Sequence, residues 1–234
     1  MKHWPSVVFT TRAIVGLLLF AAIAVLSLQA VEASHERSLI TIPTLGVLQE
    51  GDTRIGGPSY VVIQVDHLNQ PVGPEVQFNQ GSRVWGTLMG SAVGSEWREA
   101  ARNATLAAAR ALREDPREWQ VTLKEVSMAY FVDGPSASAA LAVGMVAAKR
   151  GAALLPGVVL TGTIDAEGRI SAVGALPEKI QGAAHAGFST ILIPPGQTRT
   201  RDWDLRPLSE SLHVIILEVP TLKAAYEKMT GQSL

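Results

Sequence analysis

Two polar side chains in this sequence, Ser136 and Lys179, have the types and surroundings needed for hydrolytic chemistry. Ser136 follows the turn Asp133-Gly134-Pro135 and precedes a stretch that is almost entirely apolar. Lys179 lies further along, in the first turn of a second expected helix. At a helix N-terminus, free backbone N–H groups and the positive end of the dipole converge. The pair therefore predicts a serine nucleophile with a lysine as its general base.

The surroundings of Lys179 favour the neutral amine that a general base needs. The start of a helix is the wrong end of the dipole for an ammonium group. The flanking residues are small or apolar, and burial among them would also disfavour the charge. Both effects lower the pKa of the lysine towards neutral pH. Backbone N–H groups at Ser136 and its neighbours could then stabilise the oxyanion of an acyl-transfer reaction.

Each of these residues also has an ordinary structural interpretation. Ser136 could be a simple turn residue, and Lys179 taken alone could be a solvated surface lysine. Asp133 is expected either to support the site or to act as a turn or cap residue. Thr161 is expected either to help hold Lys179 or to be an ordinary β-branched strand residue. The occurrence of Ser136 and Lys179 together favours the catalytic interpretation.

The composition indicates an ordinary globular protein with a core of useful size. The chain has 234 residues, of which 47% are hydrophobic and 18% are charged. The net charge of −1 gives no electrostatic footprint for nucleic acid, so no nucleic-acid partner is expected. Cysteine is absent, which excludes disulfides and thiolate metal sites. The histidines show no metal-binding spacing, so neither a metal nor a cofactor is predicted.

The first 33 residues predict a targeting segment. Lys2 and Arg12 precede an uncharged stretch at Ala13–Ala30, and the small residues before Ser34 resemble a signal-peptidase site. The stretch has a length between that of a signal peptide and that of a spanning helix, so a cleaved signal peptide and a retained membrane anchor both remain open. The positive-inside rule places the globular part outside the cytoplasm. We expect a periplasmic or secreted domain, attached to the membrane if the segment is retained.

Periodicity and turn residues predict the elements that must position the pair within one domain, residues 38–234. Four helices are expected, with Ser95 capping the first: residues 95–113, 137–150, 177–186 and 222–229. Strands are expected at residues 60–65, 75–78, 83–89, 120–126, 157–165, 169–173, 190–193 and 213–218. The Gly-rich stretch Glu50–Pro58 is expected to be a loop. Because strands and helices alternate irregularly, the class is α+β or mixed α/β.

Three segments of this sequence resemble motifs of one enzyme family. The sequence FVDGPSAS, residues 131–138, resembles the nucleophile motif of Lon-type serine proteases. The sequence LTGTI, residues 160–164, is similar to the Thr-Gly strand of that family, and residues 168–179 resemble its lysine-bearing segment. The resemblance covers roughly residues 38–234 and is most specific at residues 133–194.

The resemblance implies a serine endopeptidase with a polypeptide substrate, in which Ser136 is the nucleophile and Lys179 the base. It also implies the α+β Lon proteolytic domain, the fold of the second domain of a small-subunit ribosomal protein, and it allows a ring-shaped homo-oligomer. The sequence departs from the family in two ways. It has no GxxxxGK[ST] motif, which implies a stand-alone domain acting without ATP, and Thr163 replaces the acid that usually follows Thr-Gly.

Two other functions remain open for the same residues. The chain could be a non-catalytic domain of this fold that serves in binding or assembly. It could also be an amidase or esterase that uses the Ser136–Lys179 pair on a small substrate.

Overall fold

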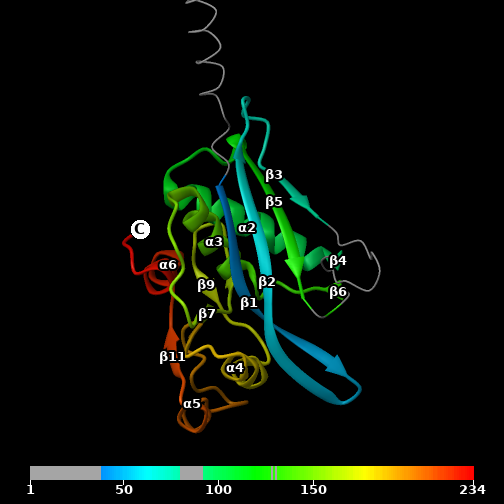
Figure 1. Ribbon diagram of the computed structural model, residues 1–234, viewed down its shortest axis with the longest axis vertical. Helices are drawn as coiled ribbons and strands as arrows, with labels where there is room; N and C mark the ends of the chain where they lie inside the picture. The colour runs from blue at the N-terminus through cyan, green and yellow to red at the C-terminus, as the bar shows by residue number, and fades with distance from the viewer. Residues whose placement is uncertain (1–37, 80–91, 128, 130) are drawn as a thin grey trace, which may run out of the picture. The chain divides into compact units, whose positions relative to one another are not determined.

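The computed structural model describes residues 38–79, 92–127, 129 and 131–234, which belong to one compact unit (Figure 1). The expected targeting segment, residues 1–33, and the expected strand at residues 83–89 lie outside these described residues. Among the helices that the structure describes, none is both long enough and apolar enough to cross a membrane.

The main sheet has four strands in the order β1-β2-β5-β3. β1 (Ser38–Glu50) and β2 (Thr53–His67) form a long antiparallel hairpin, and β5 (Trp119–Val126) pairs antiparallel with β2. β3 (Glu75–Phe78) pairs parallel with the other side of β5. Along β5 every second side chain is buried, which is the pattern of a strand with one face on the core.

Three helices pack together with this sheet. Figure 1 shows α2 (Ser95–Leu112) and α3 (Ser138–Arg150) behind the β1–β2 hairpin, and α6 (Leu222–Thr230) packs against α3. Eleven of the 13 residues of α3 are buried, which agrees with its almost wholly apolar sequence. Gly151 ends α3 in a left-handed conformation, as the sequence predicts.

A smaller parallel sheet, of order β11-β10-β7, forms a second apolar cluster with α4 and α5. Its strands are β7 (Val158–Leu160), β10 (Thr190–Ile193) and β11 (Ile215–Glu218). The two helices are α4 (Leu176–His185) and α5 (Arg206–Leu212). The remaining short elements are β4 (Ala92–Val93), β6 (Phe131–Val132), β8 (Thr163–Ile164), β9 (Ile170–Ser171) and the 3-10 turn at Pro116–Glu118. The chain therefore has a mixed α and β fold.

The structure corrects three expectations. Glu50–Pro58 is not a loop, because β1 and β2 continue to a turn at residues 51–52. The expected strand at 157–165 is two strands, β7 and β8, that belong to different sheets. Ser95 does not cap α2, since Gly94 is the N-cap and Ser95 is the first helical residue. The sequence also did not predict β1 or the helix α5.

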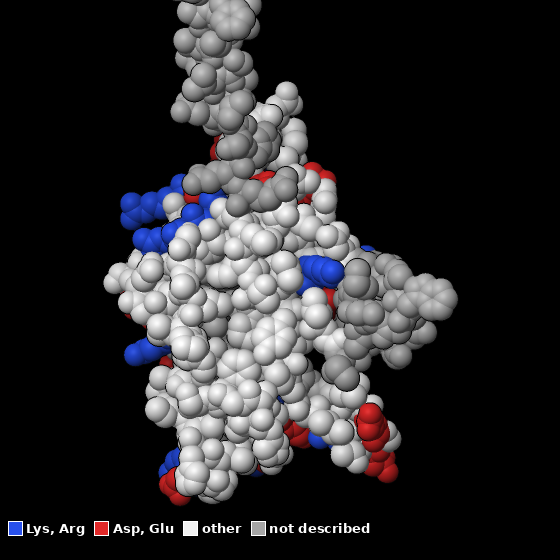
Figure 2. All heavy atoms as spheres, in the orientation of Figure 1, with Lys and Arg blue, Asp and Glu red and all other residues white. Residues whose placement is uncertain are grey.

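The outer surface of the β1–β2 hairpin is largely uncharged in this view (Figure 2). In Figure 2, which has the orientation of Figure 1, most of the described surface in front of these strands carries no charged side chain. Four large apolar side chains of the hairpin are exposed: Leu39, Leu48, Ile55 and Tyr60. Two of them, Leu48 and Ile55, belong to the half of the hairpin that lines the site described next.

Candidate active site

Ser136 is held in the turn immediately before α3 by the short segment between β7 and β8. The carbonyl oxygen of Ser136 accepts hydrogen bonds from Gly162 N at 2.9 Å and from Thr161 Oγ1 at 3.3 Å. In return, Ala139 N donates to Gly162 O at 3.1 Å. These hydrogen bonds fix the start of α3 against residues 161–162. The backbone that carries the half-buried side chain of Ser136 is therefore held in place.

Of the backbone N–H groups around Ser136, two donate hydrogen bonds within the protein and two have no acceptor among the described residues. Ser138 N donates to Pro135 O at 3.0 Å, and Ala139 N is bound as described above. Among the described residues, the N–H groups of Ser136 and Ala137 have no acceptor. Two free donors therefore lie at the start of a buried helix, where the dipole favours negative charge.

Ser138, to which the sequence assigned no role, ties α3 to a second element. Its hydroxyl donates to Pro135 O at 2.8 Å and accepts from Ile164 N of β8 at 3.0 Å. The only sequence signal for this role is a polar residue at the head of an otherwise apolar helix.

Lys179 reaches the same region from α4 and is almost completely buried. The residue is 4% exposed, and its Nζ donates a hydrogen bond to Thr161 Oγ1 at 3.3 Å. Burial lowers the pKa of Lys179 to about 8, because removal from water disfavours the ammonium form. A large fraction of this amine is therefore neutral at slightly alkaline pH.

Thr161 connects the two predicted residues. Its hydroxyl accepts from Lys179 Nζ and donates to Ser136 O, so one side chain touches both segments. Among the described residues, no hydrogen bond joins Ser136 Oγ directly to Lys179 Nζ. Catalytic hydrogen bonds are often long in a free enzyme and shorten when substrate binds.

A close crossing of α4 over β2 determines where Lys179 lies. A Cβ atom on Gly56 would lie 1.9 Å from Glu178 O, and one on Gly182 would lie 2.1 Å from Gly56 O. Only glycine permits these two backbones to approach so closely. Gly56, which lies in the stretch expected to be a loop, therefore allows the helix that carries Lys179 to pack directly on β2.

Asp133 acts as a cap residue, the second of its two sequence interpretations. Its Oδ1 accepts hydrogen bonds from Trp97 N and from Gly134 N, both at 2.9 Å. The first bond satisfies a free N–H group in the first turn of α2. The carboxylate thus fixes the turn before Ser136 against the start of α2. A Cβ on Gly94 would meet this carboxylate at 2.1 Å, so the contact also requires that glycine.

Ser136 and Lys179 line one pocket of about 560 Å³. Its walls come from the distal half of the β1–β2 hairpin, the end of β5, the start of α2 and the turn before α3. Leu48 and Ile55 supply exposed apolar surface on the hairpin side. The charged residues among the described lining are Lys179, Asp133 and Glu125. The sequence did not single out Glu125.

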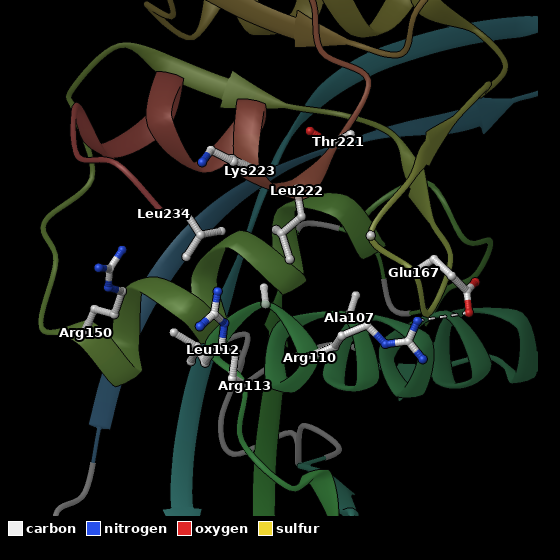
Figure 3. A pocket seen from close by; sticks show the side chains of 12 residues that line it. Ala107, Arg110, Leu112, Arg113, Arg150, Glu167, Thr221, Leu222, Lys223 and Leu234 are labelled. Atoms are coloured by element: carbon white, nitrogen blue, oxygen red, sulfur yellow. Dashed lines mark hydrogen bonds and ion pairs between the residues drawn. The ribbon is translucent and has the colours of Figure 1, made fainter.

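A second pocket, of about 580 Å³, shares no lining residue with the first (Figure 3). It lies between α2, α3 and α6 and is rich in basic side chains, including Arg113, Arg150 and Lys223. Arg110 reaches Glu167 at 3.3 Å across its edge, an exposed ion pair of the kind that contributes little to stability. None of the residues predicted to do chemistry lies here.

Comparison with known proteins matches the sequence of this chain to one family. Residues 92–219, more than half of the chain, match the model of the Lon protease (S16) C-terminal proteolytic domain. The chain is 32% identical to a Lon protease of Methylocella silvestris over 173 residues, which cover 69% of this chain and 21% of that protein. It is 30% identical to a Lon protease of Chloroflexus aurantiacus over 162 residues, which cover 65% of this chain and 19% of that protein.

The chain spans only about a fifth or less of the length of these curated relatives. A Lon protease of Orientia tsutsugamushi is 35% identical over 98 residues, which cover 12% of that protein. The family match includes the turn with Ser136, the segment with Thr161 and the helix with Lys179. The resemblance seen in the sequence is therefore confirmed, and the chain belongs to the Lon protease family, to which it is matched through the C-terminal proteolytic domain.

Proposed function

We propose that this chain is a serine endopeptidase that uses Ser136 as nucleophile and Lys179 as general base. The observation that carries the proposal is the burial of Lys179 beside Thr161, in the pocket that Ser136 also lines. A buried lysine with a lowered pKa reduces the stability of the folded protein, but its neutral amine can act as a general base. A binding or assembly domain has no comparable use for a buried amine.

The proposed reaction has two steps that share one base. Neutral Lys179 takes the proton from Ser136 Oγ, the oxygen bonds to the substrate carbonyl carbon, and Lys179 then passes that proton to the leaving amine. Water next attacks the acyl-enzyme ester, again giving its proton to Lys179, and the proton returns to Ser136 Oγ as the acid product leaves. We assign the binding of the oxyanion in both tetrahedral intermediates to the N–H groups of Ser136 and Ala137, which have no acceptor among the described residues.

The proposal includes action without ATP on chains that are already extended. The sequence contains no GxxxxGK[ST] motif for binding a nucleotide. A pocket of about 560 Å³ admits a few residues of an extended chain and not a folded domain. The expected targeting segment at residues 1–33 leads us to propose exported or membrane proteins as the substrates, cut outside the cytoplasm.

The test is degradation of casein, an unstructured protein, by the purified chain without nucleotide. We expect casein to be cleaved at the same rate with and without ATP, while a stably folded protein of similar size stays intact. Ester and single-amide substrates assayed in parallel separate an endopeptidase from a small-substrate hydrolase. Absence of casein cleavage under every nucleotide condition would reject the proposal.

A further inference from the structure

Glu125 is a carboxylate placed where the sheet should be apolar. It follows Val121 and Leu123 along the inward face of β5, and it is directly opposite the buried Val61 of β2. Glu125 is itself only 1% exposed. It lies where the packed core gives way to the pocket that holds Ser136, and it forms part of the lining of that pocket.

Glu125 has no partner among the described residues. Neither of its carboxylate oxygens makes a hydrogen bond of normal geometry, and both are shielded from solvent. Ser59, a nearby hydroxyl on the same face of the sheet, shares a 2.7 Å hydrogen bond with Thr44 instead. Burial raises the pKa of Glu125 to about 7, and the Ser59 hydroxyl opposes part of this rise.

An unpaired buried carboxylate is destabilising, so its presence requires an explanation such as a catalytic role or a bound group. The other two charged residues of the pocket lining are already engaged. Asp133 binds the amides of Trp97 and Gly134, and Lys179 binds Thr161. No ion pair joins Glu125 to Lys179 in the part of the chain that the structure describes. Of the two acidic residues in the described lining, Glu125 is thus the buried one, and neither of its carboxylate oxygens is bound.

We propose that Glu125 forms a specificity subsite that binds the cationic side chain of a lysine or arginine next to the cleaved peptide bond. This inference rests on the proposed endopeptidase function and names its substrate class. An ammonium or guanidinium group would supply the missing hydrogen bonds and the opposite charge, and arginine can donate two parallel bonds to one carboxylate. The Thr44 and Ser59 hydroxyls give this part of the pocket a polar wall.

One other arrangement would satisfy Glu125 without a substrate. Trp97, a residue of the same lining, also has a buried side-chain nitrogen, Nε1, that finds no partner in the described part of the chain. If this indole N–H turned to the carboxylate, Glu125 would be a purely structural residue. The cleavage preference of the enzyme would then not depend on the charge of Glu125.

The experiment maps every bond that the full chain cuts in casein at pH 8, by mass spectrometry, for the wild type, Glu125→Gln and Glu75→Gln. Glu75 is the matched control, because it is an exposed glutamate of the same sheet. We expect the wild type and Glu75→Gln to cut mainly beside lysine or arginine. Glu125→Gln should lose roughly 30-fold or more in kcat/KM on a basic peptide, but little on the same peptide with methionine at that position.

The possible results distinguish failure of the Glu125 subsite from failure of the proposed endopeptidase function. Casein cleavage without a basic preference, or a preference that survives in Glu125→Gln, overturns the subsite and leaves the endopeptidase in place. No cleavage of casein by any of the three proteins overturns both. Circular dichroism and a thermal melt of Glu125→Gln establish that a lost preference is not a lost fold.

Discussion

Lys179 Nζ and Thr161 Oγ1 are 3.3 Å apart, and the same threonine hydroxyl lies 3.3 Å from the carbonyl oxygen of Ser136. One buried side chain on the segment after β7 therefore contacts both the base proposed on α4 and the turn that presents the nucleophile. We infer that Thr161 is a positioning residue. It holds the amine near the start of α3 and takes no part in the bond changes.

Replacing Thr161 by valine tests this positioning role. Valine keeps the shape and removes the acceptor, so Lys179 loses its hydrogen bond and its fixed direction. We expect kcat/KM on a peptide to fall about 10- to 100-fold, with the larger part of the loss in kcat. Thr161→Ser restores the hydroxyl and should recover activity to within a few-fold of wild type. Equal activity of the valine and serine variants would show that the hydroxyl has no such role.

The pH dependence of cleavage reports the ionisation of Lys179. A general base works in its neutral form, so activity is low below its pKa and rises as the proton leaves. Because burial lowers the pKa of Lys179 to about 8, kcat/KM should rise with pH and reach half of its limit near pH 8. The measurement is a rate profile from pH 6 to 10 on a peptide without titrating groups. A rise that begins only near pH 10 would indicate an ordinary solvated lysine.

Lys179 should also lower the stability of the fold below its pKa. A lysine pKa of 10.5 when unfolded and about 8 when folded corresponds to a cost of roughly 3 kcal/mol at pH 7. Between about pH 8 and 10.5 the unfolded chain binds more protons than the folded one, so stability rises with pH across this window. Lys179→Met should therefore stabilise the protein at pH 7 and have a much smaller effect at pH 10.

Urea unfolding of wild type and Lys179→Met at both pH values measures this difference. Lys149→Met is a suitable control, because Lys149 is a more exposed lysine paired with Glu114 at 3.0 Å. It should show no such gain in stability at pH 7. A Lys179→Met variant that is less stable than wild type at pH 7 would contradict the assigned cost of burial.

The crossing of α4 over β2 predicts a sharp difference between neighbouring glycines. Gly56→Ala places a methyl group on the backbone of Glu178, so α4 must move and carry Lys179 with it. We expect at least a 10-fold loss of activity and a destabilisation of about 1–3 kcal/mol. Gly57→Ala is the matched control, since a Cβ there meets no atom within 4 Å. Peptide turnover and urea unfolding of both variants check the prediction, and equal behaviour would contradict it.

The parts of the fold with a clear local pattern could be predicted from the sequence. The apolar helix α3, the strands β5 and β10 and the helix α4 all lie within a few residues of their expected bounds. Each has a regular period, an apolar run or a clear stop such as Gly151. The turn with Ser136 and the helix with Lys179 could be recognised for the same reason.

The parts that depend on tertiary contact could not be predicted. The sequence around Gly56 predicts a loop. Its actual role is the close contact of Gly56 with α4, which lies more than a hundred positions away in the chain. Lys124 and Glu125 are adjacent charged residues, and it is the alternating burial along β5 in the folded sheet that shows Glu125 pointing inward. Nothing in the local sequence shows that the stretch at 157–165 divides between two sheets.

The measurement that tests the central claim most directly is the turnover of one casein-derived peptide by Ser136→Ala, Lys179→Met and the double variant. If the two side chains act as one catalytic unit, each single variant should lose about 1,000-fold or more in kcat, and the double variant should lose no more than either alone. Circular dichroism should show all three folded. Full activity in folded Ser136→Ala, or in folded Lys179→Met near pH 8, would contradict the account.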